Sequence, residues 1–368
     1  MPTEVPLSVW PTAQRNARAQ RSGRYLAVSG HHPARMLPAI AQRAVATALG
    51  LPAARVRVHT TRAGGGFGRR LNVDYAVQAA LVARAAGGPV QLAWDRAEDL
   101  QHDYYRPAAS AWLRAALDAA GLPVAIRART VATNDTVVDG LHGEWYGLDP
   151  LLVEAGTHRS ALPVGAWRSV DASLTCFFLE SFVDELAERA GLDPLAYRLR
   201  LAAREPRTRR VLTAAAERAG WPAGGGRARG VAAFAGWRSY VAVVAEVGRG
   251  ADGGIVVPRV YCAFDCGTAV NPALVRAQVE GGVTMAVSAA LNERITLSAG
   301  RVREQNFDDY PLLTQAAAPE VDVVLLDTPD APVGGAGEPP VPAVAPALAN
   351  ALYRLTGVRH RRLPLGRV

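Results

Sequence analysis

The segment Arg55-Val56-Arg57-Val58-His59-Thr60 and the Gly64-Gly65-Gly66-Phe67-Gly68-Arg69-Arg70 sequence that follows it decide the expected fold. Apolar and polar residues alternate over 55–60, which is typical of a half-buried β-strand. The next apolar segment, about 73–86, has helical spacing, and a short strand is expected over 89–94. A strand, a glycine loop, a helix and a second strand form a crossover unit, which predicts an α/β layer.

The rest of the chain predicts helices and strands in irregular alternation. We expect helices at 37–49, 173–189, from 194, 272–291 and 345–356. Strands are expected in a hairpin over 108–131, at 240–247 and 255–264, around a turn in 295–302, and at 321–326. Residues 1–35 are expected to be irregular, 135–165 loop-rich and 203–229 a linker. The predicted fold class is therefore α+β with mixed α/β layers, in two subdomains, 1–160 and 161–368.

Composition narrows the function classes. The 368 residues are 49% hydrophobic and 20% charged, as in a globular protein, and no apolar run reaches the roughly 20 residues that span a bilayer. The N-terminus lacks a signal-peptide pattern, so we expect a cytoplasmic protein, or a periplasmic one if a partner carries an export signal. The net charge is +8 and all 41 basic residues are Arg. They are scattered among Ala and Leu, so no nucleic-acid surface is expected.

The residue types present also exclude several chemistries. Without Lys there is no P-loop lysine and no Schiff-base lysine. The Cys residues are Cys176, Cys262 and Cys266, too few to hold an iron–sulfur cluster. No H-E-x-x-H occurs, and no set of side chains is expected to ligate a metal.

A second glycine-rich segment, Val333-Gly334-Gly335-Ala336-Gly337-Glu338-Pro339-Pro340-Val341-Pro342, carries one carboxylate. Glycine allows close approach of the backbone to a ligand, and proline is tolerated in the first turn of a helix. This setting suits a fixed general base at Glu338. The spacing alone favours instead an acidic residue that the helix dipole stabilises near an N-terminus.

The Gly64–Gly68 loop lies between an expected strand and an expected helix, where backbone N–H groups can bind an anion. It is not a G-x-G-x-x-G sequence, so a dinucleotide fold is not indicated. Phe67 suits contact with a flat group, or a core position beside a tight turn. Both interpretations remain open on these residues alone.

Several motifs together resemble the molybdopterin-dependent hydroxylases of the xanthine dehydrogenase and aldehyde oxidase superfamily. Within this superfamily, the chain is similar to the C-terminal half of the large subunit in one branch. That branch contains the isoquinoline 1-oxidoreductase β subunit and related bacterial aldehyde dehydrogenases. The motifs occur in the family's order over about 55–368. They are the glycine–phenylalanine loop at 64–70, and the segments 94–99, 103–107, 167–170, 180–187, 265–267, 270–272, 278–282, 306–311 and 335–350.

The resemblance implies roles for individual residues. Glu338 matches the catalytic glutamate. The implied cofactor-binding residues are Gly65, Gly66, Phe67, Gly68, Arg69, Arg168, Gln278, Gly281 and Gln14. Two positions depart from the family pattern. Ala13 separates Thr12 from Gln14 where the family has adjacent Thr-Gln, and Asp171 stands where the family has Gly.

The implied enzyme is a molybdopterin-dependent oxidoreductase, with the glycine–phenylalanine loop in subdomain 1–160 and Glu338 in 161–368. It would oxidise an N-heteroaromatic compound or an aldehyde with oxygen derived from water, using molybdopterin in its cytosine dinucleotide form. An iron–sulfur [2Fe-2S] small subunit would take the electrons, and a separate chain would supply the N-terminal half. The alternative is a non-catalytic scaffold subunit derived from this family. A nucleotide-binding dehydrogenase lacks its fingerprint here.

Overall fold

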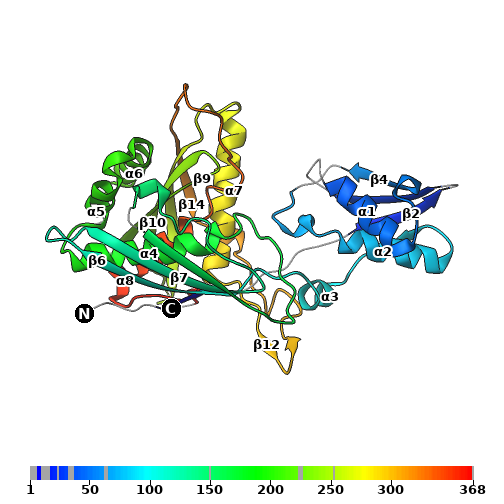
Figure 1. Cartoon of the computed structure of the whole chain (residues 1–368). Helices are drawn as coiled ribbons and strands as arrows, with labels where there is room; N and C mark the ends of the chain where they lie inside the picture. Colours follow the sequence, from blue (N-terminus) through cyan, green and yellow to red (C-terminus); the bar gives the residue numbers. More distant parts are fainter. Residues whose placement is uncertain are drawn as a thin grey trace.

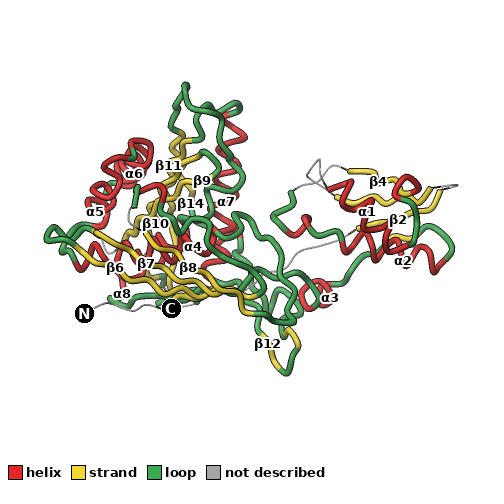
Figure 2. Tube along the Cα trace, in the orientation of Figure 1, coloured by secondary structure: helices red, strands yellow, loops and turns green. Residues whose placement is uncertain are grey.

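The computed structural model describes residues 6–9, 17–22, 25–31, 37–61, 65–148, 151–222, 227–251 and 253–366. An N-terminal unit containing α1, α2, β2 and β4 lies beside a larger body (Figure 1). The connection between them runs past α3 (Arg96–Gln101) and is mostly loop (Figure 2). The two parts have separate buried clusters, so each is held together by its own apolar contacts.

The N-terminal unit is a mixed four-stranded sheet with order β4-β3-β2-β5. The expected crossover unit is present as β4, α2 and β5, whose two strands form opposite edges of this sheet. The chain also leaves β3, forms α1 and returns as β4, parallel to β3, a crossover that the sequence did not predict. Val45, Val56 and Ala79 are fully buried where the helices meet the sheet. The elements are β2 (Ala17–Ser22), β3 (Tyr25–His31), α1 (Leu37–Leu49), β4 (Val56–Thr61), α2 (Asp74–Ala86) and β5 (Val90–Gln91).

A second four-stranded sheet lies in the larger body with order β1-β6-β7-β8. The predicted hairpin over 108–131 is confirmed as β6 and β7, which turn at Gly121. β8 runs parallel to β7 at the edge of this sheet. Its strands are β1 (Pro6–Val9), β6 (Ala109–Leu117), β7 (Pro123–Thr133) and β8 (Leu151–His158).

The third sheet has order β14-β11-β10-β9 and forms the centre of the body. Consecutive residues 241–248 of β10 are all buried, so both faces of this sheet are covered. Its strands are β9 (Ala228–Gly236), β10 (Ser239–Arg249), β11 (Ile255–Asp265) and β14 (Glu320–Leu325). The helices of the body are α4 (Ala172–Arg189), α5 (Pro194–Leu201), α6 (Pro206–Ala219), α7 (Pro272–Leu291) and α8 (Val344–Thr356).

Short elements complete the description. A two-stranded hairpin, β12 (Leu297–Ser298) with β13 (Arg301–Val302), confirms the turn expected in 295–302. Single 3₁₀ turns occur at Ala53–Arg55, Arg69–Leu71, Glu144–Tyr146, Ala202–Arg204 and Gln315–Ala317. No helix in the described part of the chain is both long and apolar enough to cross a membrane.

Three sequence predictions were wrong. Residues 1–35 contain β1, β2 and β3, and the loop-rich interval 135–165 contains β8. The strand β1 pairs with β6, which is about a hundred residues away, so no local sequence pattern predicts this strand. The expected linker 203–229 is largely α6. Its buried residues Val211, Leu212 and Ala215 lie among several Arg residues, so the apolar spacing typical of a helix is hard to recognise in the sequence. The division at 160/161 stays a prediction.

A buried ionic cluster ties α4 to α5 and to the C-terminal segment. Arg198 donates to Glu180 at 2.7 Å, and both side chains are fully buried. Asp184 accepts from Arg354 at 3.1 Å and from Arg359 at 2.6 Å. Burial opposes ionisation of Asp184, but the surrounding arginines outweigh it and hold the pKa of this carboxyl below its ordinary value.

Candidate active site

Four segments that are far apart in the sequence meet around one cavity of about 390 Å³, here called the Glu338 cavity. They are the glycine loop, the segment after β8, the turn between β9 and β10, and the loop before α8. The lining residues are Gly66, Phe67, Gly68, Arg70, Leu71, Ala166, Trp167, Arg168, Val170, Trp237 and Glu338.

Glu338 is held by Ser169 on the facing segment. The Ser169 backbone N–H donates to Oε2 of Glu338, and its hydroxyl donates to the Glu338 carbonyl at 2.6 Å. The two prolines that follow, Pro339 and Pro340, are buried. The carboxylate is therefore oriented at one oxygen, while the side chain is only half-buried and borders the cavity.

Arg168 links Glu338's loop to α7. Its Nε donates to the Gly337 carbonyl, and its NH2 group donates to both the carbonyl and the Oε1 atom of Gln278, each at 3.1 Å. Burial lowers the pKa of Arg168, and the Glu338 carboxylate partly opposes this shift. The structure thus brings together three residues that the sequence had singled out, Arg168, Gln278 and Glu338.

The glycine loop packs directly on the segment that carries Arg168. Gly68 has φ +98, and a Cβ there would lie 2.8 Å from the Trp167 nitrogen and closer still to the Ala166 carbonyl. Gly65 has φ +135, and a Cβ there would meet the Phe67 ring at 2.6 Å. These contacts explain why glycine is needed at both positions. Phe67 itself has φ 50, and 42% of its surface is exposed at the cavity.

Arg69, a candidate cofactor-binding residue, has a guanidinium group that is occupied by carboxylates. It donates to Asp103 and, through two nitrogens at 2.9 Å each, to Asp74. Its Cζ also lies 5.6 Å from the Trp94 ring centroid and 5.2 Å from that of Tyr104. Arg69 therefore joins the glycine loop to α2 and to the segment after α3.

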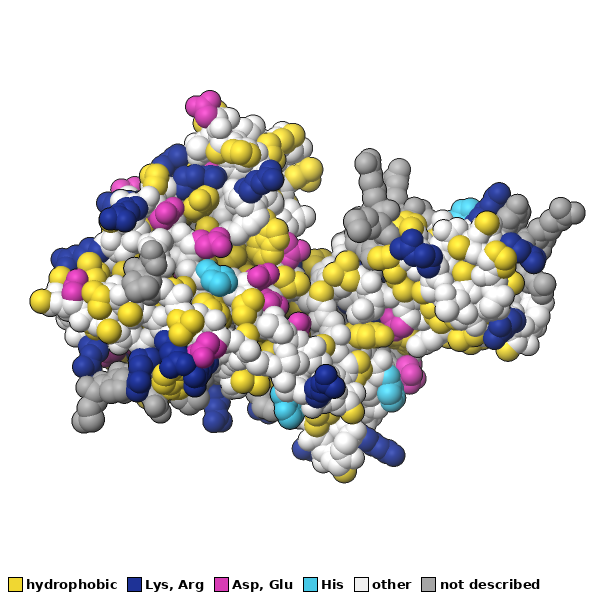
Figure 3. Space-filling view, in the orientation of Figure 1, with side chains coloured by type: hydrophobic (Ala, Val, Ile, Leu, Met, Phe, Trp, Pro, Cys, Tyr) yellow, Lys and Arg dark blue, Asp and Glu magenta, His cyan; other side chains and the backbone are white. Residues whose placement is uncertain are grey.

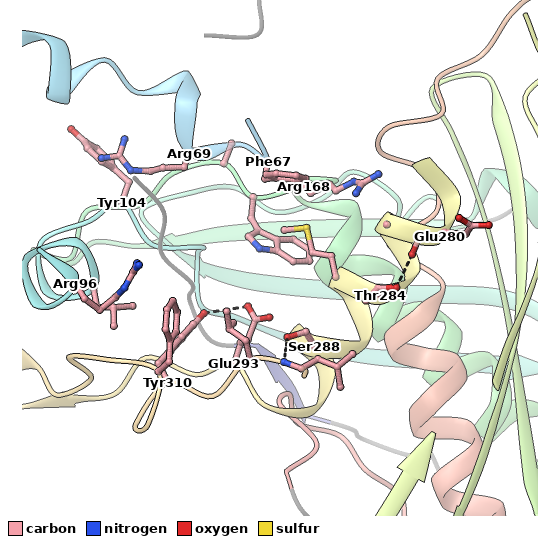
Figure 4. Close-up of a pocket in the computed structure, with 18 of the residues that line it drawn as sticks. Phe67, Arg69, Arg96, Tyr104, Arg168, Glu280, Thr284, Ser288, Glu293 and Tyr310 are labelled. Atoms are coloured by element: carbon pink, nitrogen blue, oxygen red, sulfur yellow. Dashed lines mark hydrogen bonds between the residues drawn. The ribbon is translucent and has the colours of Figure 1, made fainter. Parts of the chain in front are cut away.

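A second cavity of about 660 Å³ lies beside the first and is here called the α7 cavity (Figure 4). The two share a wall made of Phe67, Ala166, Trp167 and Arg168. The Tyr310 hydroxyl donates to Glu293 at 3.2 Å inside the α7 cavity. Burial raises the pKa of Glu293. Gly281 lines this cavity. A Cβ added at Gly281 would have no neighbour within 4 Å outside the nearby backbone of its own helix.

The remaining predicted positions can be placed briefly. Gln14 lies outside the described residues. Cys176, Cys262 and Cys266 are buried free cysteines. In the described ranges, no three His, Cys, Asp or Glu side chains gather closely enough to hold a metal ion.

Sequence reasoning gave no site role to six residues that line the Glu338 cavity, of which Arg70, Ala166 and Trp167 are three. The other three are Leu71, Val170 and Trp237. Each is a large apolar residue that is at least 40% exposed. An apolar residue gives no local signal that it lines a cavity, because most such residues are in the core.

Comparison with known proteins places the chain in a family. Residues 32–139 and 200–319 match two family models, each described as a molybdopterin cofactor-binding domain. The chain belongs to the family of proteins that contain molybdopterin cofactor-binding domains. The recognition made from the motifs and the predicted fold class are both confirmed.

Relatives of this family are similar over most of the chain. The isoquinoline 1-oxidoreductase subunit beta of Brevundimonas diminuta is 32% identical over 89% of this chain and 45% of its own length. The membrane-bound aldehyde dehydrogenase (pyrroloquinoline-quinone) of Gluconacetobacter polyoxogenes is 31% identical over 87% of this chain and 47% of its own length. The chain thus spans about half the length of these two curated relatives.

The fold has close counterparts among solved structures. Quinoline 2-oxidoreductase from Pseudomonas putida 86 superposes with a TM-score of 0.84 at 14% identity, covering 100% of this chain and 75% of that one. At such low identity the likeness concerns the fold.

The residues of the two cavities fit a molybdopterin cofactor. The space at Gly281 can take a ligand against α7, and Gly68 brings the glycine loop against the segment 166–168. The glycine loop and Arg168 line the Glu338 cavity and would hold the pterin. Gln278 lines neither cavity, and its Oε1 accepts from Arg168, so it would act by positioning that guanidinium.

Proposed function

We propose that this chain is the catalytic subunit, or part of one, of a molybdenum hydroxylase that oxidises an N-heteroaromatic compound or an aldehyde. The observation that carries the proposal is the position of Glu338, oriented by Ser169 beside the glycine–phenylalanine loop and one residue from the carbonyl that Arg168 binds. A carboxylate fixed at the border of an apolar cavity is a suitable general base.

The chain's residues have distinct tasks in this proposal. The overall reaction converts a C–H bond and water into a C–OH group, two protons and two electrons. When bound, the cofactor supplies the oxygen atom and takes up the two electrons. Glu338 accepts a proton as the new C–O bond forms, and Ser169 keeps Oε2 oriented. The apolar wall gives the substrate a surface to pack against beside Glu338.

The cofactor site is proposed to span both halves of the chain. We assign Gly65, Gly66, Phe67 and Gly68 to one side of the cofactor, and Arg168, Gln278 and Gly281 to the other, with the cofactor in its cytosine dinucleotide form. The two family matches lie on either side of residue 160, which supports subdomains 1–160 and 161–368. Arg69 contributes by fixing the loop.

The electrons are proposed to pass to a [2Fe-2S] subunit. An iron–sulfur cluster of this kind needs four ligands, commonly thiolates, and this chain has three Cys, all of them buried. The chain spans about half of two curated relatives, and the proposed catalytic subunit includes a second part of comparable length. The cytoplasm is the proposed location, with the periplasm as the alternative.

The competing proposal is a scaffold subunit that binds no cofactor. Molybdenum analysis of the protein, purified with the chains that accompany it, discriminates between the two. A catalytic subunit is expected to contain about one molybdenum per chain and to reduce an artificial dye with an aldehyde or an N-heteroaromatic compound. A preparation without molybdenum, in cells that make active molybdenum enzymes, would favour the scaffold.

A further inference from the structure

The turn between β9 and β10 places a tryptophan at the Glu338 cavity. Gly236 pairs with Ser239, which leaves Trp237 and Arg238 as a two-residue turn. Their φ angles are 50 and 64. Turns of this kind favour Asn and Gly, so a tryptophan in one is held there by its surroundings.

The surroundings that hold Trp237 belong to the loop that carries Glu338. The Gly335 N–H donates to the Trp237 carbonyl at 2.8 Å, and the Ser239 hydroxyl donates to the Gly335 carbonyl at 2.6 Å. A Cβ on Gly334 would lie 2.7 Å from the Arg238 carbonyl. The position of Trp237 relative to Glu338 is therefore set by direct backbone contact.

The indole ring is supported on one side and open on the other. Its centroid lies 5.9 Å from that of Phe234, which in turn lies 5.2 Å from that of the buried Trp145. Even so, 40% of Trp237 is exposed. A rigidly supported aromatic ring that keeps an open surface is suited to stack on a flat ligand.

The other walls combine apolar area with two arginines. Phe67, Leu71 and Val170 complete the apolar lining, and each is at least 40% exposed. Arg70 and Arg168 also line the cavity, and the Arg168 guanidinium donates to the Gly337 carbonyl and to Gln278. The lining thus offers apolar and aromatic area beside the Glu338 carboxylate.

We propose that Trp237 determines substrate specificity by stacking on a planar N-heteroaromatic ring and presenting a ring carbon to Glu338. This inference rests on the proposed function and deepens it, because it selects flat heteroaromatic substrates over small aliphatic aldehydes. The stacked face of the ring would lie against the indole. The edge of the ring would point toward the carboxylate.

The test compares substrates in the holoenzyme. For Trp237→Ala, kcat/KM with quinoline or isoquinoline is expected to fall about 5- to 100-fold, which is the range that loss of one stacking contact gives. With acetaldehyde, kcat/KM is expected to change by less than about threefold, because an aliphatic aldehyde has no ring to stack. Trp237→Phe keeps an aromatic face and is expected to retain most of the heteroaromatic activity.

Trp112→Ala is the matched control. Trp112 lies on β6 of another sheet, where Arg114 stacks on it, and it lines neither cavity. This variant is expected to leave both activities unchanged. Equal losses with both substrates in Trp237→Ala, or no loss with either, would overturn the proposal.

A binding measurement tests the stacking role of Trp237 even if the proposed function is wrong. A preparation that turns over no substrate contradicts the proposed function but still permits calorimetric titration with quinoline. Weaker binding to Trp237→Ala than to the wild type, by about fivefold or more, supports the stacking role. Equal affinity in the two proteins overturns it.

Discussion

Gly68→Ala should separate the glycine loop from the segment that holds Arg168. An added Cβ would lie 2.8 Å from the Trp167 nitrogen and nearer still to the Ala166 carbonyl, both of which are backbone. Backbone cannot swing aside as a long side chain can, so the two segments must move apart. We expect the variant to lose the cofactor, because both segments are proposed to hold it.

The magnitude follows from two contributions. Positive φ at a non-glycine residue costs about 1–2 kcal/mol. Overpacking against a rigid neighbour costs about 1–3 kcal/mol. Together they destabilise the local structure by about 2–5 kcal/mol, a large part of the stability of a typical domain.

The assay is molybdenum content together with the thermal unfolding midpoint. Gly253→Ala is the control, because Gly253 has φ +80 and a Cβ there would meet nothing within 4 Å. This control carries most of the backbone strain without the collision. If Gly68→Ala and Gly253→Ala retained molybdenum equally and unfolded at the same temperature, the contact between the two segments would not matter for cofactor binding.

Two further predictions concern ion pairs. Arg69→Lys keeps the positive charge but loses the forked guanidinium contacts to Asp74 and Asp103. We expect the free energy of unfolding in urea to fall by about 1–3 kcal/mol. The kcat of the cofactor-loaded enzyme should change little. Because the pKa of Asp184 is held below its ordinary value, its stabilising effect is present above that ordinary value and is lost as pH falls through the folded value. Asp184→Asn should therefore cost about 3–5 kcal/mol at pH 7, and this cost should shrink only as pH falls well below the ordinary Asp pKa of about 3.9. An equal cost at pH 7 and well below that pKa would contradict this.

Long periodic helices were the most predictable part of the fold. The helices 37–49 and 272–291 have the bounds that their apolar spacing and end residues predict. The second begins where Asn271 accepts a hydrogen bond from the Leu274 N–H at 3.1 Å. Strands were harder, because β1 and β8 are defined by partners elsewhere in the chain.

In the candidate site, too, some features could be predicted from the sequence and others depend on distant parts of the chain. Glu338, Arg168 and the glycine loop stood out in the sequence because their motifs resemble a known family. Their contact with one another depends on tertiary structure, since Ser169 and Glu338 are separated by 169 positions. Trp237 had no such motif. Only its position in a tight turn beside Gly335 reveals that it lines the cavity.

In Figure 3 the dark-blue arginine side chains are spread over both the body and the N-terminal unit. On the face shown they are interspersed with hydrophobic and acidic side chains.

The most direct test of the central claim is the turnover rate of Glu338→Gln in molybdenum-loaded enzyme. The amide keeps the shape of the side chain and can still accept from Ser169, but it cannot take up the proton. If Glu338 is the general base, the rate should fall by at least about 10²- to 10⁴-fold while molybdenum content stays at the wild-type level. Turnover near the wild-type rate at equal molybdenum content would show that another group takes the proton.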